Sequence, residues 1–250
     1  MKSSADTKKK EGWGESLRMI IYAVLIALVV RAFLFQPFNI PSSSMVPTLL
    51  VGDYLFVSKY AYGYSKHSLP FSPPLFDGRI LAREPERGDV IVFKVPSDNR
   101  TDYIKRLIGL PGDTIQMRHG QVVLNGEPVP RERVGDFVSE GPFGQERAVP
   151  QYRETLPNGV SYMTLDTVPD GMEDNTGVYE VPEGHYFMMG DNRDNSRDSR
   201  VPGAVGYVPF ENLVGRAEII FFSTNGEAQW WQVWEWPMSV RWGRLFDWIN

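Results

Sequence analysis

An uncharged apolar run near the N-terminus constrains this chain more than any other feature. Residues 19–30 carry no charge, and beyond Arg31 the apolar character continues to Phe35. A helix of these seventeen residues spans about 26 Å, close to the roughly 30 Å of a bilayer's hydrocarbon core. Arg31 falls near the end of the run, where a long side chain can reach the headgroups. The run predicts a transmembrane anchor at residues 18–36.

Three other interpretations of this run are less consistent with the sequence. A buried core helix would show a polar stripe, and a helix lying in the membrane plane needs one even more. A cleaved signal peptide needs a small-x-small site just after its apolar segment. The first such site, at Ser42 and Ser44, lies well beyond residue 30 and follows two prolines. We therefore expect a retained anchor.

Basic residues are distributed unevenly around the run. Five of them precede it, and none occurs between Phe35 and Lys59. Cytoplasmic flanks of membrane helices are enriched in lysine and arginine. This distribution predicts a cytoplasmic segment at residues 1–17, with the chain from about residue 37 onward on the outer face of the membrane.

Composition excludes several classes of function. The net charge is −5 and the pI is about 5.3, so clustered positive charge for a nucleic-acid partner is not expected. The chain has no cysteine, which excludes disulfides, thiolate nucleophiles and cysteine-ligated zinc. Residues 190–200 lack the glycine and glutamate positions of a calcium loop, and their three arginines would repel the ion. We expect no metal and no cofactor.

The chain after the anchor predicts a mainly β fold. Short β-rich stretches bounded by Gly, Pro, Asp or Asn recur, and no long amphipathic helical pattern is present. They lie at residues 54–57, 89–95, 114–118, 121–124, 178–181, 186–189 and 217–222. Residues 128–175 are looser and more polar, with weak strand signals only at 160–165. We expect a larger β core at residues 37–113 and 183–250, with a smaller β lobe inserted at 114–182.

The C-terminal segment is rich in tryptophan. Residues 230–248 hold six of the seven tryptophans. Because the indole ring is apolar and its N–H is polar, tryptophan is favoured at membrane interfaces. The segment is therefore expected either to rest on the bilayer or to pack in the core as the last helix or strand.

Three polar or mixed stretches carry residues that can do chemistry. Residues 38–49 hold three consecutive serines between prolines, which by composition alone indicate a solvated linker. In residues 102–113, Lys105 precedes an apolar run. If its amine is buried, its pKa falls from about 10.4 and it becomes a usable general base, whereas an edge-strand lysine would reach solvent. Residues 190–200 alternate in charge, as a solvated loop does.

Together with the anchor, these stretches resemble the sequences of the bacterial signal peptidase I family. Members of this family are membrane-anchored serine endopeptidases with a Ser-Lys dyad. The shared blocks, in the family's order, are S-x-S-M-x-P-T-L at residues 42–49, R-G-D-V-I-V-F at 87–93, Y-I-K-R-x-x-G-L-P-G-D at 103–113 and G-D-N-R-D-N-S-x-D-S-R at 190–200. The resemblance implies an antiparallel β-sheet core of the signal-peptidase and repressor-protease type. It also implies removal of signal peptides from exported preproteins after small-x-small sites.

The resemblance also implies roles for individual residues. Ser44 is the expected nucleophile and Lys105 its general base. The Ser44 backbone N–H and the Ser42 hydroxyl would form the oxyanion hole. Ser196 would orient Lys105. Supporting polar contacts are expected from two pairs, Asp191 with Arg106 and Asp198 with Arg200.

Six further positions match the family's substrate cleft. They are Phe38, Ile40, Met45, Leu49, Tyr103 and Ile104. Each is equally compatible with ordinary core packing. The substrate is expected to bind as an added β-strand, with shallow pockets that reject large side chains. One departure concerns Ser43, which stands where many members carry glycine.

The expected setting is the bacterial inner membrane, crossed once, with the catalytic domain on the periplasmic face. The expected partners are signal-peptide-bearing preproteins and the lipid bilayer, without nucleic acid, and the chain is expected to be a monomer. A repressor-type autoprotease would instead begin with a helix-turn-helix. An anchored non-catalytic β-rich binding module and a peptidase with few clients are also compatible with the sequence.

Overall fold

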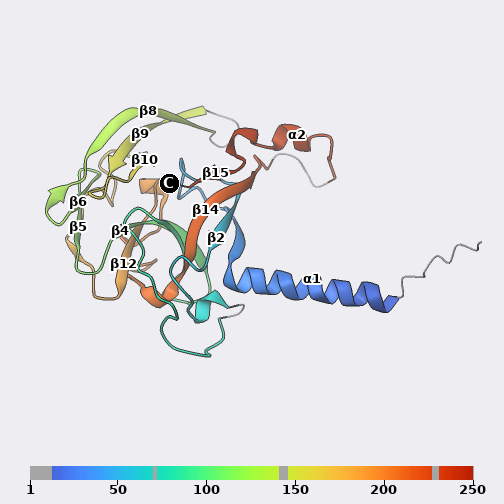
Figure 1. The fold of residues 1–250 in the computed structure, drawn as a ribbon. Coiled ribbons are helices and arrows are strands. Elements are labelled where there is room, and N and C mark those ends of the chain that lie inside the picture. Colours follow the sequence, from blue (N-terminus) through green and yellow to red (C-terminus); the bar gives the residue numbers. More distant parts are fainter. Residues whose placement is uncertain (1–12, 70–71, 141–145, 227–230, 250) are drawn as a thin grey trace, which may run out of the picture.

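A single long helix projects from a body made of β-strands (Figure 1). The computed structural model describes residues 13–69, 72–140, 146–226 and 231–249. Helix α1, Trp13–Phe33, is apolar and long enough to cross a bilayer, and none of its spanning window is buried. The core-helix interpretation is therefore wrong.

Helix α1 ends earlier than the predicted anchor. Its last residue is Phe33, and strand β1, Phe35–Asn39, begins two residues later. Pro37 explains the difference, because a proline lacks the N–H needed to continue a helix and disfavours helical geometry in the residue before it. Phe35 and Gln36 belong to the β body.

The largest sheet contains eight strands and is antiparallel throughout. Its order is β1-β2-β14-β3-β4-β12-β13, with β15 paired to β14. The further strands are β2 Asp53–Ser58, β3 Val90–Lys94, β4 Asp102–Gly109, β12 His185–Met189, β13 Val208–Pro209, β14 Leu213–Ser223 and β15 Asp247–Trp248. The predicted mainly β fold is confirmed.

Two smaller sheets are built from the segment between β4 and β12. One has the order β11-β5-β6-β7 and the other β10-β9-β8. Their strands are β5 Thr114–Arg118, β6 Gln121–Leu124, β7 Glu127–Pro128, β8 Arg131–Glu140, β9 Glu146–Thr155, β10 Ser161–Leu165 and β11 Tyr179–Glu180. All of them fall within residues 114–182, and the independence of that segment as a domain stays a prediction.

The expectation of a loose segment at 128–175 is wrong for strands β8 and β9. Each is ten residues long, and together they form a hairpin that arches over the body in Figure 1. Most described side chains of β9 are at least partly exposed. A strand that is wet on both faces needs no apolar alternation, so its sequence resembles a polar loop.

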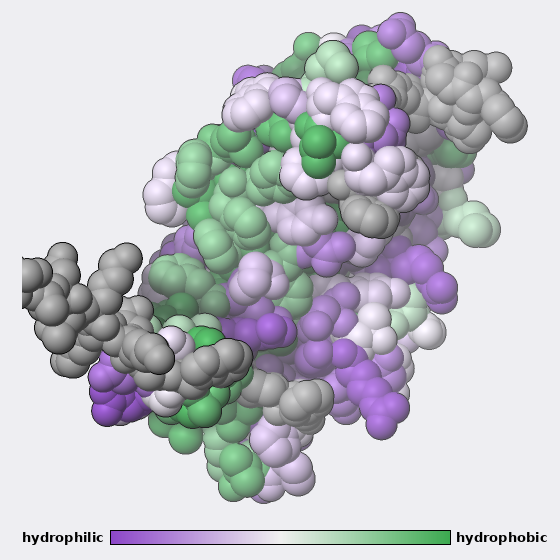
Figure 2. Space-filling model, turned by 90° about the vertical axis from the view of Figure 1, so that its right-hand side faces the viewer, coloured by the Kyte–Doolittle hydropathy of each residue, from purple (hydrophilic) through white to green (hydrophobic). Residues whose placement is uncertain are grey.

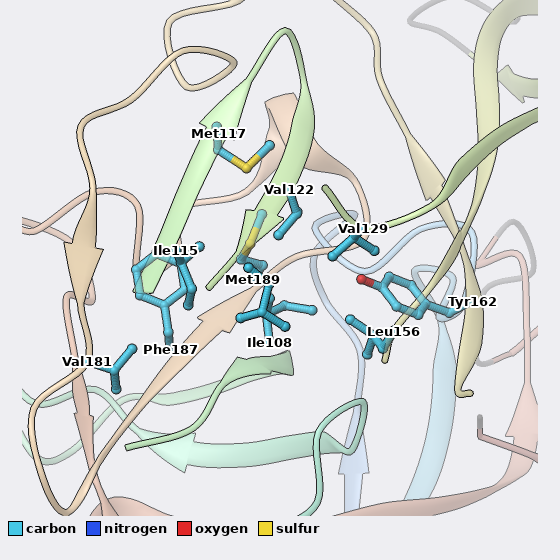
Figure 3. Packing of buried hydrophobic residues seen from close by; sticks show 11 residues of the cluster. Ile108, Ile115, Met117, Val122, Val129, Leu156, Tyr162, Val181, Phe187 and Met189 are labelled. Carbon is cyan, nitrogen blue, oxygen red and sulfur yellow. The ribbon is translucent and has the colours of Figure 1, made fainter. Parts of the chain in front are cut away.

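A buried cluster joins the small sheets to the large one. Ile115 and Met117 from β5 pack with Phe187 and Met189 from β12, and all four are almost completely buried (Figure 3). Tyr162 from β10 belongs to the same cluster. Burying each such side chain stabilises the fold by roughly 1.5–3 kcal/mol. The cluster therefore holds β5 and β10 firmly against the large sheet.

The remaining elements are short. They are α2, Trp236–Ser239, and the 3₁₀ turns η1 Lys66–Ser68, η3 Arg193–Asn195, η4 Phe210–Asn212 and η5 Trp242–Arg244. Trp231, Trp234, Trp236, Trp242 and Trp248 expose between 48% and 66% of their surface, so core packing is the wrong interpretation for them. Trp230 lies outside the described residues. Figure 2 shows pale and apolar side chains gathered on the face from which α1 projects.

Candidate active site

Ser44 and Lys105 meet in the interior although 61 positions separate them in the chain. Lys105 lies on β4, and Ser44 lies in the turn that follows β1. The Lys105 Nζ donates a hydrogen bond of 2.5 Å to the Ser44 Oγ, and a second of 3.0 Å to the Ile104 carbonyl. Lys105 is 3% exposed and Ser44 is 8% exposed. The two groups are thus in contact and largely screened from water.

Burial changes the acidity of Lys105. It lowers the pKa of the ammonium from 10.5 to about 8, because the charged form loses its hydration. Asp198 and Asp191 partly oppose this shift, and the positive charge of Arg200 adds to it. The ring of Tyr103 lies 5.5 Å from the Nζ. A large fraction of Lys105 is therefore neutral near pH 8 and able to accept a proton.

Ser42 lies beside Ser44. Their hydroxyl oxygens are 3.3 Å apart, and both residues line the same cavity. Ser42 is exposed, whereas Ser44 is buried at the cavity wall. A hydroxyl donor is therefore available next to the Ser44 oxygen.

Asp191 and Arg106 form a buried salt bridge behind the Ser44 and Lys105 pair. The Arg106 Nε and Nη2 donate to the two Asp191 carboxylate oxygens at 2.9 and 2.8 Å. Thr48, in the turn that carries Ser44, donates to the same carboxylate at 2.5 Å. Breaking a buried pair of this kind by removing one partner typically costs about 3–5 kcal/mol. The bridge ties β4 and the segment after β12 to the Ser44 turn.

Asp198 and Arg200 form a second buried salt bridge. The Arg200 Nε and Nη2 donate to the Asp198 carboxylate, each at 2.9 Å. Burial opposes ionisation, but the Arg200 charge and hydrogen bonds hold the pKa of Asp198 below its usual value. The Gly190 N–H also donates to Asp198 at 2.9 Å. The pair fixes the 190–200 segment at its start.

Ser196 is buried close to the Ser44 backbone. A methyl group built on Gly190 would lie 2.2 Å from the Ser196 Oγ and 2.5 Å from the Ser44 carbonyl oxygen. The Ser196 hydroxyl interacts with Asp198 and helps to hold the pKa of that carboxyl below its usual value. The structure therefore brings Ser196 to the site without the expected contact to Lys105, and its orienting role stays a prediction.

Two asparagines that the sequence did not single out hold the Ser44 turn. The Asn192 N–H donates to the Ser44 carbonyl at 3.1 Å, and its side-chain amide donates to the Ser43 carbonyl at 3.1 Å. The Asn195 amide donates to the Ser43 hydroxyl at 2.6 Å. Both asparagines lie in the 190–200 block, but no sequence pattern shows which backbone groups they reach.

A cavity of about 580 Å³ opens in front of Ser44 and Lys105. Of the predicted cleft residues, Phe38, Ile40, Tyr103 and Ile104 line it. Met45 and Leu49 do not line it. The cavity is further lined by Asn39, Pro41, Val92, Thr101, Asp102, Asn195 and Arg197.

The cleft assignment of Met45 and Leu49 therefore stays a prediction, since neither lines this cavity. Both are completely buried and pack with Leu55 and Val57 of β2 and with Ile220 of β14. They share this cluster with Ile40 and Ile104 of the cavity wall, so they lie directly behind that wall. The packing of these two residues in the core supports the turn that carries Ser44.

Two strand edges without partners flank the cavity. Among the described strands, β1 pairs only with β2, so its other edge is free. Residues 102–105 of β4 pair with β3, whereas the pairing of β4 with β12 begins only at Arg106. Free strand edges present backbone donors and acceptors to an extended peptide. The cavity can therefore accept a peptide chain along either wall.

Comparison with known proteins shows the family of this chain. The model of the family described as "Signal peptidase, peptidase S26" matches residues 13–222. Signal peptidase I of Rickettsia conorii is 42% identical, covering 98% of this chain and 95% of the relative, and that of Rickettsia prowazekii is 43% identical, covering 90% and 89%.

Among solved structures, a signal peptidase I from Enterococcus faecalis is similar over 54% of this chain and 97% of that one. Its sequence identity is 26% and the TM-score is 0.32. The family match extends from the first residues of α1 almost to the end of β14, and the Rickettsia relatives align over nearly their whole length. The chain belongs to the signal peptidase family, peptidase S26.

Proposed function

We propose that the chain is a signal peptidase I, a membrane-bound serine endopeptidase that removes signal peptides from exported preproteins. The observation that carries the proposal is the 2.5 Å hydrogen bond between the Lys105 Nζ and the Ser44 Oγ at the wall of a peptide-sized cavity. A serine hydroxyl is a weak nucleophile until a base accepts its proton. A neutral lysine amine can be that base.

In the first half of the reaction, the Ser44 Oγ attacks the scissile carbonyl carbon while its proton moves to the Lys105 Nζ. The resulting oxyanion accepts hydrogen bonds from the Ser44 N–H and the Ser42 hydroxyl. The C–N bond then breaks, and Lys105 returns the proton to the leaving amine of the mature protein. The signal peptide is left as an ester on Ser44.

In the second half, a water molecule gives a proton to Lys105 and attacks the ester carbonyl. The same oxyanion donors stabilise the second tetrahedral intermediate, and the Ser44 oxygen takes back the proton as it leaves. Losing one oxyanion donor typically lowers kcat by about 10² to 10³. Ser42 therefore contributes to both halves.

The cavity supports selection of small residues. Its apolar wall, with Phe38, Ile40 and Ile104, leaves room for an extended chain whose alternate side chains point toward the wall. Main-chain hydrogen bonds to β1 or to residues 102–105 of β4 hold such a chain without reading its side chains. Small residues at the first and third positions before the cut fit this arrangement.

Two features support attachment to a membrane by one helix. The first is the exposed apolar surface of α1. The second is the set of exposed C-terminal tryptophans, of which Trp248 lines a cavity of about 700 Å³ together with Ala27 and Val30 of α1. Tryptophan beside a spanning helix is typical of the interface region. The catalytic domain then lies on the outer face, with the N-terminus in the cytoplasm.

Cleavage of a preprotein tests the proposed activity. Full-length protein in detergent is incubated with a secretory preprotein, and the products are mapped by mass spectrometry. Wild type is expected to cut after a small-x-small site, whereas Ser44→Ala and Lys105→Ala leave the preprotein intact. Ser97→Ala, at an exposed serine that does not line the cavity, is the matched control and is expected to cut like wild type.

The outcomes separate the competing functions. Cutting by Ser44→Ala at the wild-type rate would show that another residue is the nucleophile. If wild type cuts none of several unrelated preproteins, the non-catalytic binding module or the few-client peptidase replaces the general enzyme.

A further inference from the structure

A second cavity lies beside the anchor and is strongly basic. Its volume is about 550 Å³. Its charged or titratable lining residues are Arg31, Lys59, His67, Lys94, Arg100 and Asp102. Asp102 also lines the cavity in front of Ser44 and Lys105, so the two cavities are neighbours, but neither Ser44 nor Lys105 lines the second one.

The described carboxylates balance the positive charge of this cavity only in part. Its single carboxylate, Asp102, pairs with Lys94 at 2.9 Å. Within the described part of the chain, no carboxylate lies within 4.0 Å of the basic nitrogens of Arg31, Lys59 or Arg100. Three cationic side chains therefore converge on one space without an anion.

Two of the lining side chains are buried and can make further hydrogen bonds. Lys59 is 2% exposed, and its Nζ donates to the Ser68 carbonyl at 2.5 Å. His67 is 5% exposed, and its Nε2 has no hydrogen-bond partner among the described residues. Leaving buried polar groups without partners is costly unless another group satisfies them.

The acidity of Lys59 reflects the same imbalance. Burial, followed by the nearby charge of Arg31, lowers the pKa of Lys59 from 10.5 to about 8. Asp102 opposes this shift only in part. An anion in the cavity would raise the pKa of Lys59 by supplying a further opposite charge.

We propose that this cavity binds a phosphate group, and that the source of the phosphate is the headgroup of an anionic membrane lipid. Arginine forks pair with phosphate oxygens bidentately, and lysine adds a point charge. Arg31 and Arg100 are exposed at the mouth, and Lys59 is buried in the wall. The volume lies within the range of small-molecule sites.

The position of Arg31 distinguishes a lipid from other anions. Arg31 belongs to the last turn of α1, so if α1 spans the membrane as proposed above, the cavity mouth lies at the level of the headgroups. The inference rests on that proposed anchoring. A lipid held there would fix the start of β4, and with it the cleft, relative to the membrane surface, because Asp102 borders both cavities.

Lipid binding to the full-length chain tests the proposal. Detergent-purified protein is titrated with phosphatidylglycerol or phosphatidylcholine, and bound lipid is counted by native mass spectrometry. A parallel arm titrates inorganic phosphate, followed by ³¹P line broadening. Wild type is expected to bind phosphatidylglycerol at least about tenfold more tightly than phosphatidylcholine, since choline cancels the phosphate charge.

Single substitutions test which residues bind phosphatidylglycerol. Arg100→Gln, at an exposed position, is expected to weaken phosphatidylglycerol binding about tenfold, as expected for one lost charge-assisted contact. Lys59→Met is expected to abolish the preference, and its fold is checked by circular dichroism. Arg118→Gln is the matched control, because Arg118 is an exposed arginine on β5 outside this cavity. It is expected to bind like wild type.

Four results would overturn the proposal. The first is equal binding of both lipids by wild type, and the second is unchanged phosphatidylglycerol binding by Arg100→Gln. The third is binding of inorganic phosphate without binding of lipid. The fourth is an effect of Arg100→Gln confined to the cleavage of preproteins with acidic residues after the cut. The Ser44→Ala variant is titrated in parallel, and flotation of the protein with vesicles checks the anchoring. Failure of this proposal is thereby separated from failure of the proposed peptidase or anchor.

Discussion

Two buried lysines differ in the atom that each Nζ contacts. Lys105 and Lys59 are 3% and 2% exposed, and burial lowers the pKa of each to about 8. The Lys105 Nζ contacts a serine hydroxyl, whereas the Lys59 Nζ contacts a backbone carbonyl. A hydroxyl can give up a proton and a carbonyl cannot. Burial alone therefore does not identify a general base, and the contacting atom does.

The pH dependence of cleavage should report the neutral form of Lys105. Because the pKa of its ammonium is about 8, kcat/KM is expected to rise with pH and to reach half its plateau near pH 8. At pH 6 the neutral fraction is about one hundredth, so kcat/KM falls by about 10². A peptide substrate followed from pH 6 to 10 measures the profile.

The control for this profile is His119→Gln, which removes an exposed imidazole on the turn after β5. It is expected to leave the midpoint near pH 8. A profile that is flat, or that falls as the pH rises, would contradict a lysine base.

Lys105 should also weaken the fold where it is charged. The unfolded pKa is near 10.5 and the folded pKa is about 8, so between these values the folded state binds fewer protons and stability rises with pH. Below pH 8 the full penalty, at most about 3 kcal/mol, remains. Lys105→Met removes the penalty. Its stability relative to wild type is expected to be greatest below pH 8 and to decline toward pH 10.5.

Urea unfolding of both proteins at pH 7 and pH 10 measures this difference. Ser97→Ala serves as a control for the effect of substitution itself. A variant whose advantage is the same at both pH values would mean that Lys105 is not penalised by burial.

At the scale of elements, the site is a junction between the turn after β1 and the segment after β12. Asp191 reaches Arg106 and Thr48, and Asn192 reaches the Ser44 carbonyl. Ser43 adds a contact through its hydroxyl to Asn195, which a glycine at that position would not make. The position of Ser44, the proposed nucleophile, therefore depends on close packing between two segments that are about 150 residues apart.

Gly190 tests how closely these segments must approach. An alanine methyl group would lie 2.5 Å from the Ser44 carbonyl oxygen, so Gly190→Ala is expected to displace the Ser44 turn and lower kcat/KM at least about tenfold. Gly177→Ala is the matched control, because no atom lies within 4 Å of its added methyl group. Peptide cleavage and thermal unfolding are measured for both.

Equal activity of the two glycine variants would show that the Ser44 turn tolerates displacement. Loss of folding in Gly190→Ala, seen as a much lower Tm, would attribute the effect to stability instead.

At the scale of the whole molecule, the features that favour contact with a membrane lie on one side of the protein. Helix α1 projects from the face where apolar and aromatic side chains gather (Figure 2). Trp248 and α1 line a common cavity, and Arg31 of α1 lines the basic one. If α1 spans the membrane as proposed, this arrangement places the cavity in front of Ser44 and Lys105 on the body that adjoins the membrane surface.

The orientation in the membrane can be tested because the chain contains no cysteine. In intact spheroplasts, Asp170→Cys, at an exposed position, is expected to react with an impermeant maleimide, whereas Lys8→Cys reacts only after permeabilisation. The cysteine-free wild type is the unlabelled control. The reverse pattern would place the catalytic domain in the cytoplasm.

Local sequence determined the features that depend on neighbouring residues. The long apolar run predicted a helix that the structure confirms, and the limits of β5 and β6 agree with the turns that bound them. The blocks at residues 42–49, 103–113 and 190–200 were recognisable as motifs. Each of these signals is short-range, because periodicity and turn chemistry act over a few residues.

Only the tertiary structure decided the features that depend on distant segments. These include the contact between Lys105 and Ser44, the inward direction of Met45 and Leu49, and the polar hairpin of β8 and β9. They also include the exposure of the C-terminal tryptophans and the convergence of unpaired cations beside the anchor. Burial, charge balance and hydrogen-bond distance are set by which surfaces pack together. No pattern within one short segment specifies that packing.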